Sequence, residues 1–283
     1  MRMDSNPLHD IPSETTTAAR NLYNVQHIYI RIGDQLDTIL GRVNVELFDS
    51  TSRLNPTSLS RLALTSAFQL AEGLSDSQAA QSTYQRLDWK YALCLPVKHP
   101  GISEYELCRF RQGLYGSTSG QRQFNILLAE LRRVGLFPRS TAPLLDTQAA
   151  LDRICQITRL YALDLAIKEA LGMLVSFAPD WLLGNVSPHW YERYSTRRVN
   201  PAHRFASEDL QVEASRLGSD VSHLLEALQM EDAGDLTQRP EIQTLNYLFH
   251  AQFTSSGDAV QWQPVNCIDC SFYNPVTGGK DYG

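Results

Sequence analysis

A long apolar stripe in the second half of the sequence restricts the possible folds of this chain most strongly. Apolar residues recur at every third or fourth position, at Ala150, Ile154, Ile157, Leu160, Leu163, Ile167, Leu171, Leu174 and Phe177. This spacing places them on one face of an α-helix, which at 1.5 Å per residue would span about 45 Å. Pro179 ends the helix. Such a stripe must be buried against other helices, so the expected fold is mainly α.

A helix-turn-helix outline lies in the first half of the chain. Residues 59–71 show helical apolar spacing, and Ser58 is expected to cap this helix. Gly73 ends it, and Ser75 caps the next helix. Two short helices joined in this way are typical of a DNA-binding helix-turn-helix. Ordinary packing of two helices predicts the same pattern, so both interpretations stay open.

Most of the remaining elements are also expected to be helical. The predicted helices cover residues 28–48, 103–114, 121–134, 207–228 and 241–250. The only β-structure expected is a small hairpin near the C-terminus, around Phe253 and residues 260–262. The predicted fold is therefore a helical N-terminal domain of the DNA-binding type followed by a helical insertion.

Charge is distributed unevenly along the sequence. The total of -6 disfavours a nucleic-acid partner, but residues 82–139 hold 9 basic and 4 acidic residues, a local excess of +5. No apolar run approaches the roughly 18 residues of a membrane span, and no secretory signal is evident. We therefore expect a cytoplasmic protein with no membrane partner.

The five cysteines favour an intracellular protein with free thiols. Cys94, Cys108 and Cys155 lie in apolar or helical surroundings and are expected to be small buried side chains. Cys267 and Cys270 form a lone CxxC pair, whereas zinc takes four ligands. We interpret this spacing as chance, with a metal or redox role as the less favoured alternative.

Several short motifs follow one another in a fixed order. Residues 71–80 read AEGLSDSQAA, and residues 86–93 read RLDWKYAL. The later stretches read FRQGL, APDWL, WYERY and PEIQTL, at residues 110–114, 178–182, 190–194 and 240–245. In this order, from about residue 32 to residue 282, the motifs strongly resemble the N-terminal region of bacterial insertion-sequence transposases of the DDE class.

The resemblance implies DNA transposition and recombination on an RNase H-like core. In that family three acidic residues hold two Mg²⁺ ions that assist phosphoryl transfer. The first carboxylate corresponds to Asp146, which would be both a catalytic residue and a metal ligand. The family motif resembles DST, whereas residues 146–148 read DTQ. Asp146 is equally suited to cap the helix that follows it.

The end of the sequence departs further from the family. Residues 272–283 reach the point at which relatives continue into the second Asp and the Glu of the catalytic core. The chain is therefore expected to be truncated and inactive alone, with no Mg²⁺ bound. Its expected partners are mobile-element ends and either a separately encoded C-terminal transposase half or further copies of itself.

The resemblance also suggests where DNA would be contacted. Arg86, Lys90, Arg109 and Arg111 are the candidates for phosphate or base-edge contacts. For any one of them, a solvated helix face explains the charge equally well. The alternative function is a non-catalytic helical scaffold or interaction protein without a nucleic-acid role.

Four regions are predicted along the chain. Residues 1–25 form a disordered lead, and residues 26–140 form the helical domain with the helix-turn-helix-like segment. Residues 141–235 form a long-helix scaffold segment. Residues 236–283 form a linker and the start of an incomplete catalytic core.

Overall fold

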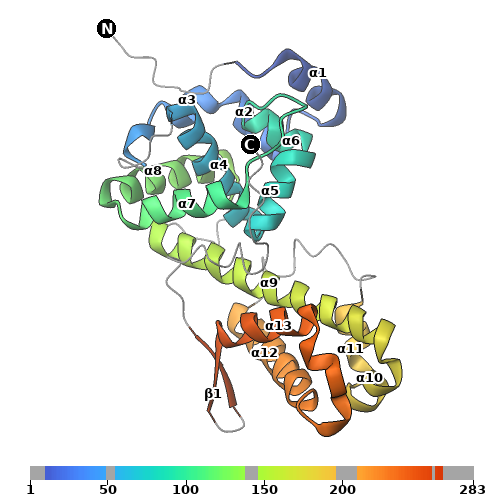
Figure 1. The fold of residues 1–283 in the computed structure, drawn as a ribbon. Helices are drawn as coiled ribbons and strands as arrows, with labels where there is room; N and C mark the ends of the chain where they lie inside the picture. Colours follow the sequence, from blue (N-terminus) through green and yellow to red (C-terminus); the bar gives the residue numbers. More distant parts are fainter. Residues whose placement is uncertain (1–9, 49–54, 138–145, 196–208, 257–258, 264–283) are drawn as a thin grey trace. The chain divides into compact units, whose positions relative to one another are not determined.

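The computed structural model describes residues 10–48, 55–137, 146–195, 209–256 and 259–263 (Figure 1). The chain divides into two compact units. Among the described residues, unit 1 extends to Cys155 and unit 2 begins at Gln156. The described residues are mainly helical with only a small two-stranded sheet, so the predicted fold class is confirmed. Among these residues, no helix is both long enough and apolar enough to cross a membrane.

Unit 1 consists of helices packed around a buried apolar core. Its elements are α1 (Ser13–Leu22), α2 (Ile28–Asp34), α3 (Leu36–Leu40), η1 (Val45–Leu47), α4 (Pro56–Glu72), α5 (Asp76–Gln85), α6 (Leu87–Ala92), α7 (Glu104–Tyr115), α8 (Thr118–Val134) and the first turns of α9 (Thr147–Phe177). The single helix predicted over residues 28–48 is wrong, because this stretch is broken into α2, α3 and η1.

Unit 2 contains the rest of α9 and the C-terminal elements. These are α10 (Pro179–Asn185), α11 (His189–Tyr194), α12 (Leu210–Ala227), η4 (Glu231–Gln238), α13 (Pro240–His250), β1 (Phe253–Ser256) and β2 (Ala259–Trp262). The two strands pair antiparallel, with Phe253 opposite Trp262. The predicted hairpin near the C-terminus is therefore present, and α12 packs against its second strand.

The long apolar stripe forms one continuous helix, α9, of 31 residues. Most of the stripe is buried, as periodicity predicts, including Ile154, Leu163 and Leu174 at 0% exposure. Phe177 is 62% exposed, so its assignment to the core is wrong. The Arg239 guanidinium lies 3.9 Å from the centre of the Phe177 ring and covers part of it.

The predicted disorder of residues 1–25 is wrong for the described part of that lead. Residues 13–22 form α1, and the Thr15 hydroxyl donates to the carbonyl of Leu95 at 2.8 Å. Ala19 is fully buried against Ile30 and Tyr91. Since α1 has little apolar surface of its own, these contacts with distant residues hold the helix in place.

The described cysteines differ from the expectation of free thiols. Cys94 is buried and free. Cys108 and Cys155 are buried as predicted, but both are disulfide-bonded. The CxxC pair, Cys267 and Cys270, lies outside the described residues.

Candidate nucleic-acid interface

The helix-turn-helix outline corresponds to α4, a three-residue turn and α5. The Asn55 side chain caps α4 by accepting from the Ser58 amide at 2.8 Å, so the predicted cap at Ser58 is wrong by three residues. Gly73 ends α4 with a φ of 66°, a left-handed conformation that glycine adopts without strain. Ser75 caps α5 in a reciprocal capping box with Gln78. Both helices and the turn are therefore present.

The first residue of α5 is fastened by a buried charge pair. Asp76 accepts a hydrogen bond from Gln69 of α4 and one from Arg111 of α7, each at 2.7 Å. A second guanidinium nitrogen of Arg111 contacts the other carboxylate oxygen. Asp76 is 0% exposed and Arg111 is 1% exposed. Arg111, a predicted DNA contact, therefore fixes α5 to α7 and presents no surface to a ligand.

Arg86 fastens the other end of α5. Its guanidinium donates to Glu72 at 2.5 Å and to Asp88 at 2.8 and 3.2 Å. It also lies 5.0 Å from the centre of the Trp89 ring and 5.3 Å from that of Tyr29. Burial alone lowers the pKa of Arg86, but the hydrogen bonds and charges of the two carboxylates outweigh burial and raise it. The charge of Arg86 is therefore neutralised within unit 1.

Glu72, at the end of α4, connects this cluster to the apolar core. It accepts hydrogen bonds from the Tyr29 hydroxyl and, at 3.2 Å, from the Trp89 indole nitrogen. The Phe68 ring meets those of Tyr29 and Trp89 edge-on, with centroids 4.8 and 5.4 Å away. Burial and the neighbouring carboxylate raise the pKa of Tyr29 well above its ordinary value. The motif residues of this region thus join α2, α4 and α6.

The Lys90 side chain also makes its contacts within unit 1. Its ammonium group donates to the carbonyls of Val97 and, at 3.1 Å, of His99. The residue is 4% exposed, and burial lowers its pKa. Lys90 therefore holds the loop after α6 and is not available to contact DNA in this structure.

Arg109 differs from the other three candidates. It lies on the exposed side of α7 and has no ion pair or hydrogen bond with any residue that the structure describes. Lys98 and Arg122 are also exposed and also have no ion pair or hydrogen bond with any described residue. Motif-based reasoning missed these two cations because they lie outside the quoted motifs. The charge count over residues 82–139 already included both. The structure does not bring the four predicted residues together into one surface.

Asp146, the candidate catalytic residue, is exposed immediately before α9. One carboxylate oxygen accepts from the Ala149 amide at 3.3 Å, as a helix cap does. Within the described ranges, no three His, Cys, Asp or Glu side chains gather closely enough to hold a metal ion. The cap interpretation of Asp146 is thus supported, whereas its catalytic role stays a prediction.

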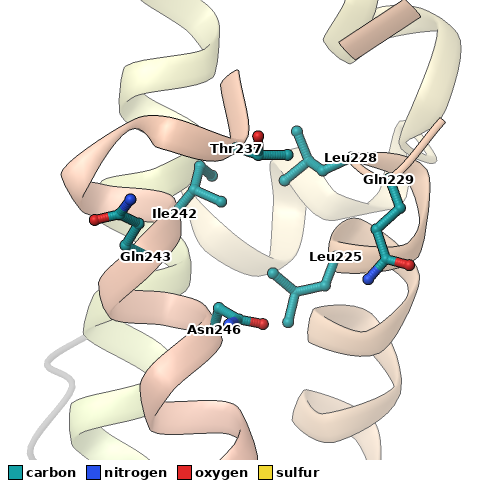
Figure 2. Close-up of a pocket in the computed structure, with 7 residues that line it drawn as sticks. All are labelled: Leu225, Leu228, Gln229, Thr237, Ile242, Gln243 and Asn246. Atoms are coloured by element: carbon teal, nitrogen blue, oxygen red, sulfur yellow. The ribbon is translucent and has the colours of Figure 1, made fainter. Parts of the chain in front are cut away.

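Unit 2 contains a cavity of ≈ 230 Å³ between α12, η4 and α13 (Figure 2). Leu225, Leu228 and Ile242 form its apolar part. The polar lining consists of uncharged side chains, those of Gln229, Thr237, Gln243 and Asn246. These seven residues include no acid–base group at neutral pH, and the Thr237 hydroxyl has no base among them to activate it.

No family model, curated protein or solved structure matches this chain. The proposed function therefore depends on the quoted motifs and on the geometry of α4, the turn and α5.

Proposed function

We propose that this protein belongs to the DDE transposase family and that unit 1 binds the DNA of mobile-element ends. The observation that supports this proposal is the arrangement of α4 and α5, which are joined by a three-residue turn. In DNA-binding helix-turn-helix domains the second helix enters the major groove and the first crosses the backbone. An orientation of α5 fixed at both ends suits that role, because base recognition needs a rigid reading helix.

The exposed side of α5 carries polar side chains without charge. Gln81, Tyr84 and Gln85 are exposed, and α5 contains no Lys or Arg. Glutamine amides can pair with adenine edges in the major groove. Phosphate contacts would then come from the exposed cations Lys98 and Arg109 rather than from Arg86, Lys90 or Arg111.

The catalytic part of the proposal needs more metal-binding carboxylates than the described residues of this chain bring together. In complete relatives, three carboxylates hold two Mg²⁺ ions, which activate the attacking group and stabilise the leaving oxygen. Asp146 would supply one carboxylate. A separately encoded C-terminal half would supply the others, and the assembly would act in the cytoplasm.

One observation favours the alternative, a helical scaffold without a nucleic-acid role. Three of the four cations expected to contact DNA, Arg86, Lys90 and Arg111, are held by contacts within unit 1. In the scaffold interpretation the motif residues serve folding alone.

The two functions are separated by a DNA-binding titration. Fluorescence anisotropy would measure the affinity of the full chain for terminal-repeat duplexes and for a scrambled duplex, at low and high salt. We expect binding that weakens with salt, and the slope of log affinity against log salt should fall by about one in Arg109→Ala. Arg42→Ala is the matched control, because Arg42 is exposed but pairs with Glu130 at 2.8 Å. Absence of binding at low salt would exclude the DNA-binding proposal and leave the scaffold.

A further inference from the structure

The cavity of unit 2 has a floor of buried apolar side chains. Leu225, Leu228 and Ile242 line it, and each of them is at most 8% exposed. The volume of ≈ 230 Å³ is smaller than the about 300–1,000 Å³ of most sites for drug-sized ligands. It is larger than an apolar cavity of about 150 Å³ that holds benzene. The space therefore suits a single apolar side chain better than a cofactor.

The rim of the cavity can form hydrogen bonds but carries no charge. It consists of the side chains of Gln229, Thr237, Gln243 and Asn246. None of these four side chains makes a hydrogen bond with another residue that the structure describes. An amide side chain both donates and accepts hydrogen bonds, as the peptide backbone does. The rim thus offers partners for the N–H and C=O groups of a bound peptide.

The sequence around the cavity is acidic. Residues 226–241 run from the end of α12 through η4 into α13, and they hold five acidic residues and one basic residue, Arg239. An excess of negative charge repels the phosphates of a nucleic acid and attracts basic segments. The charge of this region therefore favours a neutral or basic partner and disfavours DNA.

Exposed apolar side chains lie next to rim residues in the sequence. Met230 directly follows Gln229, and Tyr247 directly follows Asn246; they are 65% and 49% exposed. Tyr247 also lies one helical turn after Gln243 on α13, so these two side chains share a face of the helix. Exposed apolar groups beside a pocket are typical of a protein interaction site, in which the pocket takes an anchor side chain.

We propose that this cavity is a docking site for a peptide segment of a partner protein, and that the segment is uncharged or basic and inserts one apolar side chain. The inserted side chain would contact Leu225, Leu228 and Ile242, and the backbone beside it would bond with the amides of the rim (Figure 2). All residues of the site belong to unit 2, so this proposal does not depend on DNA binding by unit 1.

An NMR titration of the full-length chain with acetylated and amidated five-residue peptides tests the proposal. The probe KALAK carries one leucine between two lysines. The peptide KAAAK lacks the apolar anchor, and EALAE reverses the charge. We expect KALAK to bind at least about tenfold more tightly than KAAAK, because burial of a leucine side chain is strongly favourable. KALAK should also bind more tightly than EALAE, by a factor that shrinks as salt screens the charges.

Variants of the protein link binding to the cavity. Asn246→Trp places a large ring at the rim and should weaken KALAK binding at least about tenfold. Gln211→Trp is the matched control, because Gln211 is exposed on α12 about 20 Å along the helix from Leu225. Gln243→Ala removes a single rim amide and should weaken binding about two- to tenfold. Both altered rim positions are exposed, so all three variants should keep the unfolding temperature of the unaltered chain.

Several results would overturn the proposal. Absence of KALAK binding, or equal binding of KALAK and KAAAK, would show that the cavity takes no apolar anchor. Unchanged affinity in both Asn246→Trp and Gln243→Ala would place the peptide elsewhere. Displacement of KALAK by a single-stranded oligonucleotide would assign the site to nucleic acid. A dimer in sedimentation experiments that Asn246→Trp dissociates would show that a second copy of this chain occupies the cavity.

Discussion

Unit 1 encloses a charged pair completely, whereas three ion pairs of unit 2 have cations that stay partly exposed to water, those of Lys168, Arg193 and Arg216. The side chains of Arg111 and Asp76 in unit 1 are 1% and 0% exposed. In unit 2, Arg216 pairs with Glu213 and is 40% exposed, and Lys168 pairs with Asp164 and is 27% exposed. Both of these pairs join neighbouring turns of one helix. A third pair, between Arg193 of α11 and Asp220 of α12, does join two helices, and the Arg193 side chain is 27% exposed.

The exposed apolar surface differs in the same direction. In the part of the chain that the structure describes, the large exposed apolar side chains of unit 2 are Leu165, Val175, Phe177, Leu183, Tyr191, Val212, Met230 and Tyr247, against Leu22, Val25, Tyr84 and Tyr105 in unit 1. Unit 1 thus exposes fewer large apolar side chains than unit 2. It also contains the buried Asp76–Arg111 pair between α5 and α7, which we call the polar lock. We infer that a fully buried charge pair helps to fix helix orientation in unit 1, whereas the pair that joins α11 and α12 in unit 2 is partly exposed to water.

The largest expected effect comes from breaking the polar lock. Arg111→Leu leaves Asp76 buried without its cation and should destabilise unit 1 by about 3–5 kcal/mol, because a lone buried charge is poorly solvated. Urea unfolding, with hydrogen exchange in α5 and α7, would measure the loss. The unit 2 counterpart, Arg216→Ala, should cost less than about 1 kcal/mol, since its cation is exposed.

A double variant tests whether charge itself causes that loss. In Asp76→Asn combined with Arg111→Met, the amide oxygen still accepts from Gln69 while no buried charge remains. Most of the lost stability should return. A double variant as unstable as Arg111→Leu would show that packing, rather than the charge pair, locks α5.

The next largest effect tests close packing in both units. A Cβ added at Gly33 would lie 2.5 Å from the Tyr91 ring in unit 1, and one at Gly218 would lie 2.5 Å from the Phe253 ring in unit 2. Each Gly→Ala substitution should cost about 1–3 kcal/mol through overpacking. Gly172→Ala in α9 is the control: apart from its chain neighbours and the nearby backbone of α9, no atom lies within 4 Å of the added Cβ, so the change should stabilise the helix by up to about 1 kcal/mol. Gains at all three positions would disprove close packing.

Helix caps provide a smaller comparison between the units. Ser75→Ala removes the cap of α5, and Asp209→Ala removes that of α12, whose carboxylate accepts from the Gln211 amide at 2.9 Å. A lost cap costs about 1 kcal/mol on average. Ser75 is fully buried, so the loss in unit 1 should exceed that in unit 2. Equal losses by urea unfolding would contradict a special role for the turn.

A further expected effect is a dependence on alkaline pH. Burial, together with the Asp34 carboxylate, raises the pKa of Tyr91 from 10.0 to about 12. A raised pKa means that the protonated phenol stabilises the folded state. This contribution is complete below pH 10 and is lost as the pH rises through 12. Tyr91→Phe should flatten the decline in urea midpoint between pH 9 and pH 12, and an unchanged decline would assign it to other groups.

Local sequence patterns were sufficient for most of the helices. The apolar spacing predicted α9, and the residues around Gly73 predicted the end of α4 and the start of α5 within a residue or two. Errors arose where a neighbour far along the chain decides the outcome. Helix α1 was missed because Ala19 is buried by residues outside its own segment. Phe177 fits the helical spacing but is mostly exposed, since periodicity does not show where the partner surface ends.

The candidate DNA contacts show the same limit more sharply. Residue type identifies a positive charge, but the sequence does not show whether a carboxylate neutralises it. Asp76 and Arg111 are 35 positions apart, and Glu72 and Arg86 are 14 apart, so only folding brings these charges together. Arg109 and Lys98 remained exposed for the same reason, since no carboxylate of the described chain reaches them.

The sequence by itself determined the helical class, the long α9, and the turn between α4 and α5, because these features depend on periodicity and on residues a few positions apart. The tertiary structure decided which motif residues hold the fold and which stay open to a partner. The physical reason is that burial and ion pairing depend on contacts between distant positions. Those contacts enclose Arg111 and Lys90 in unit 1 and leave Arg109 at its surface.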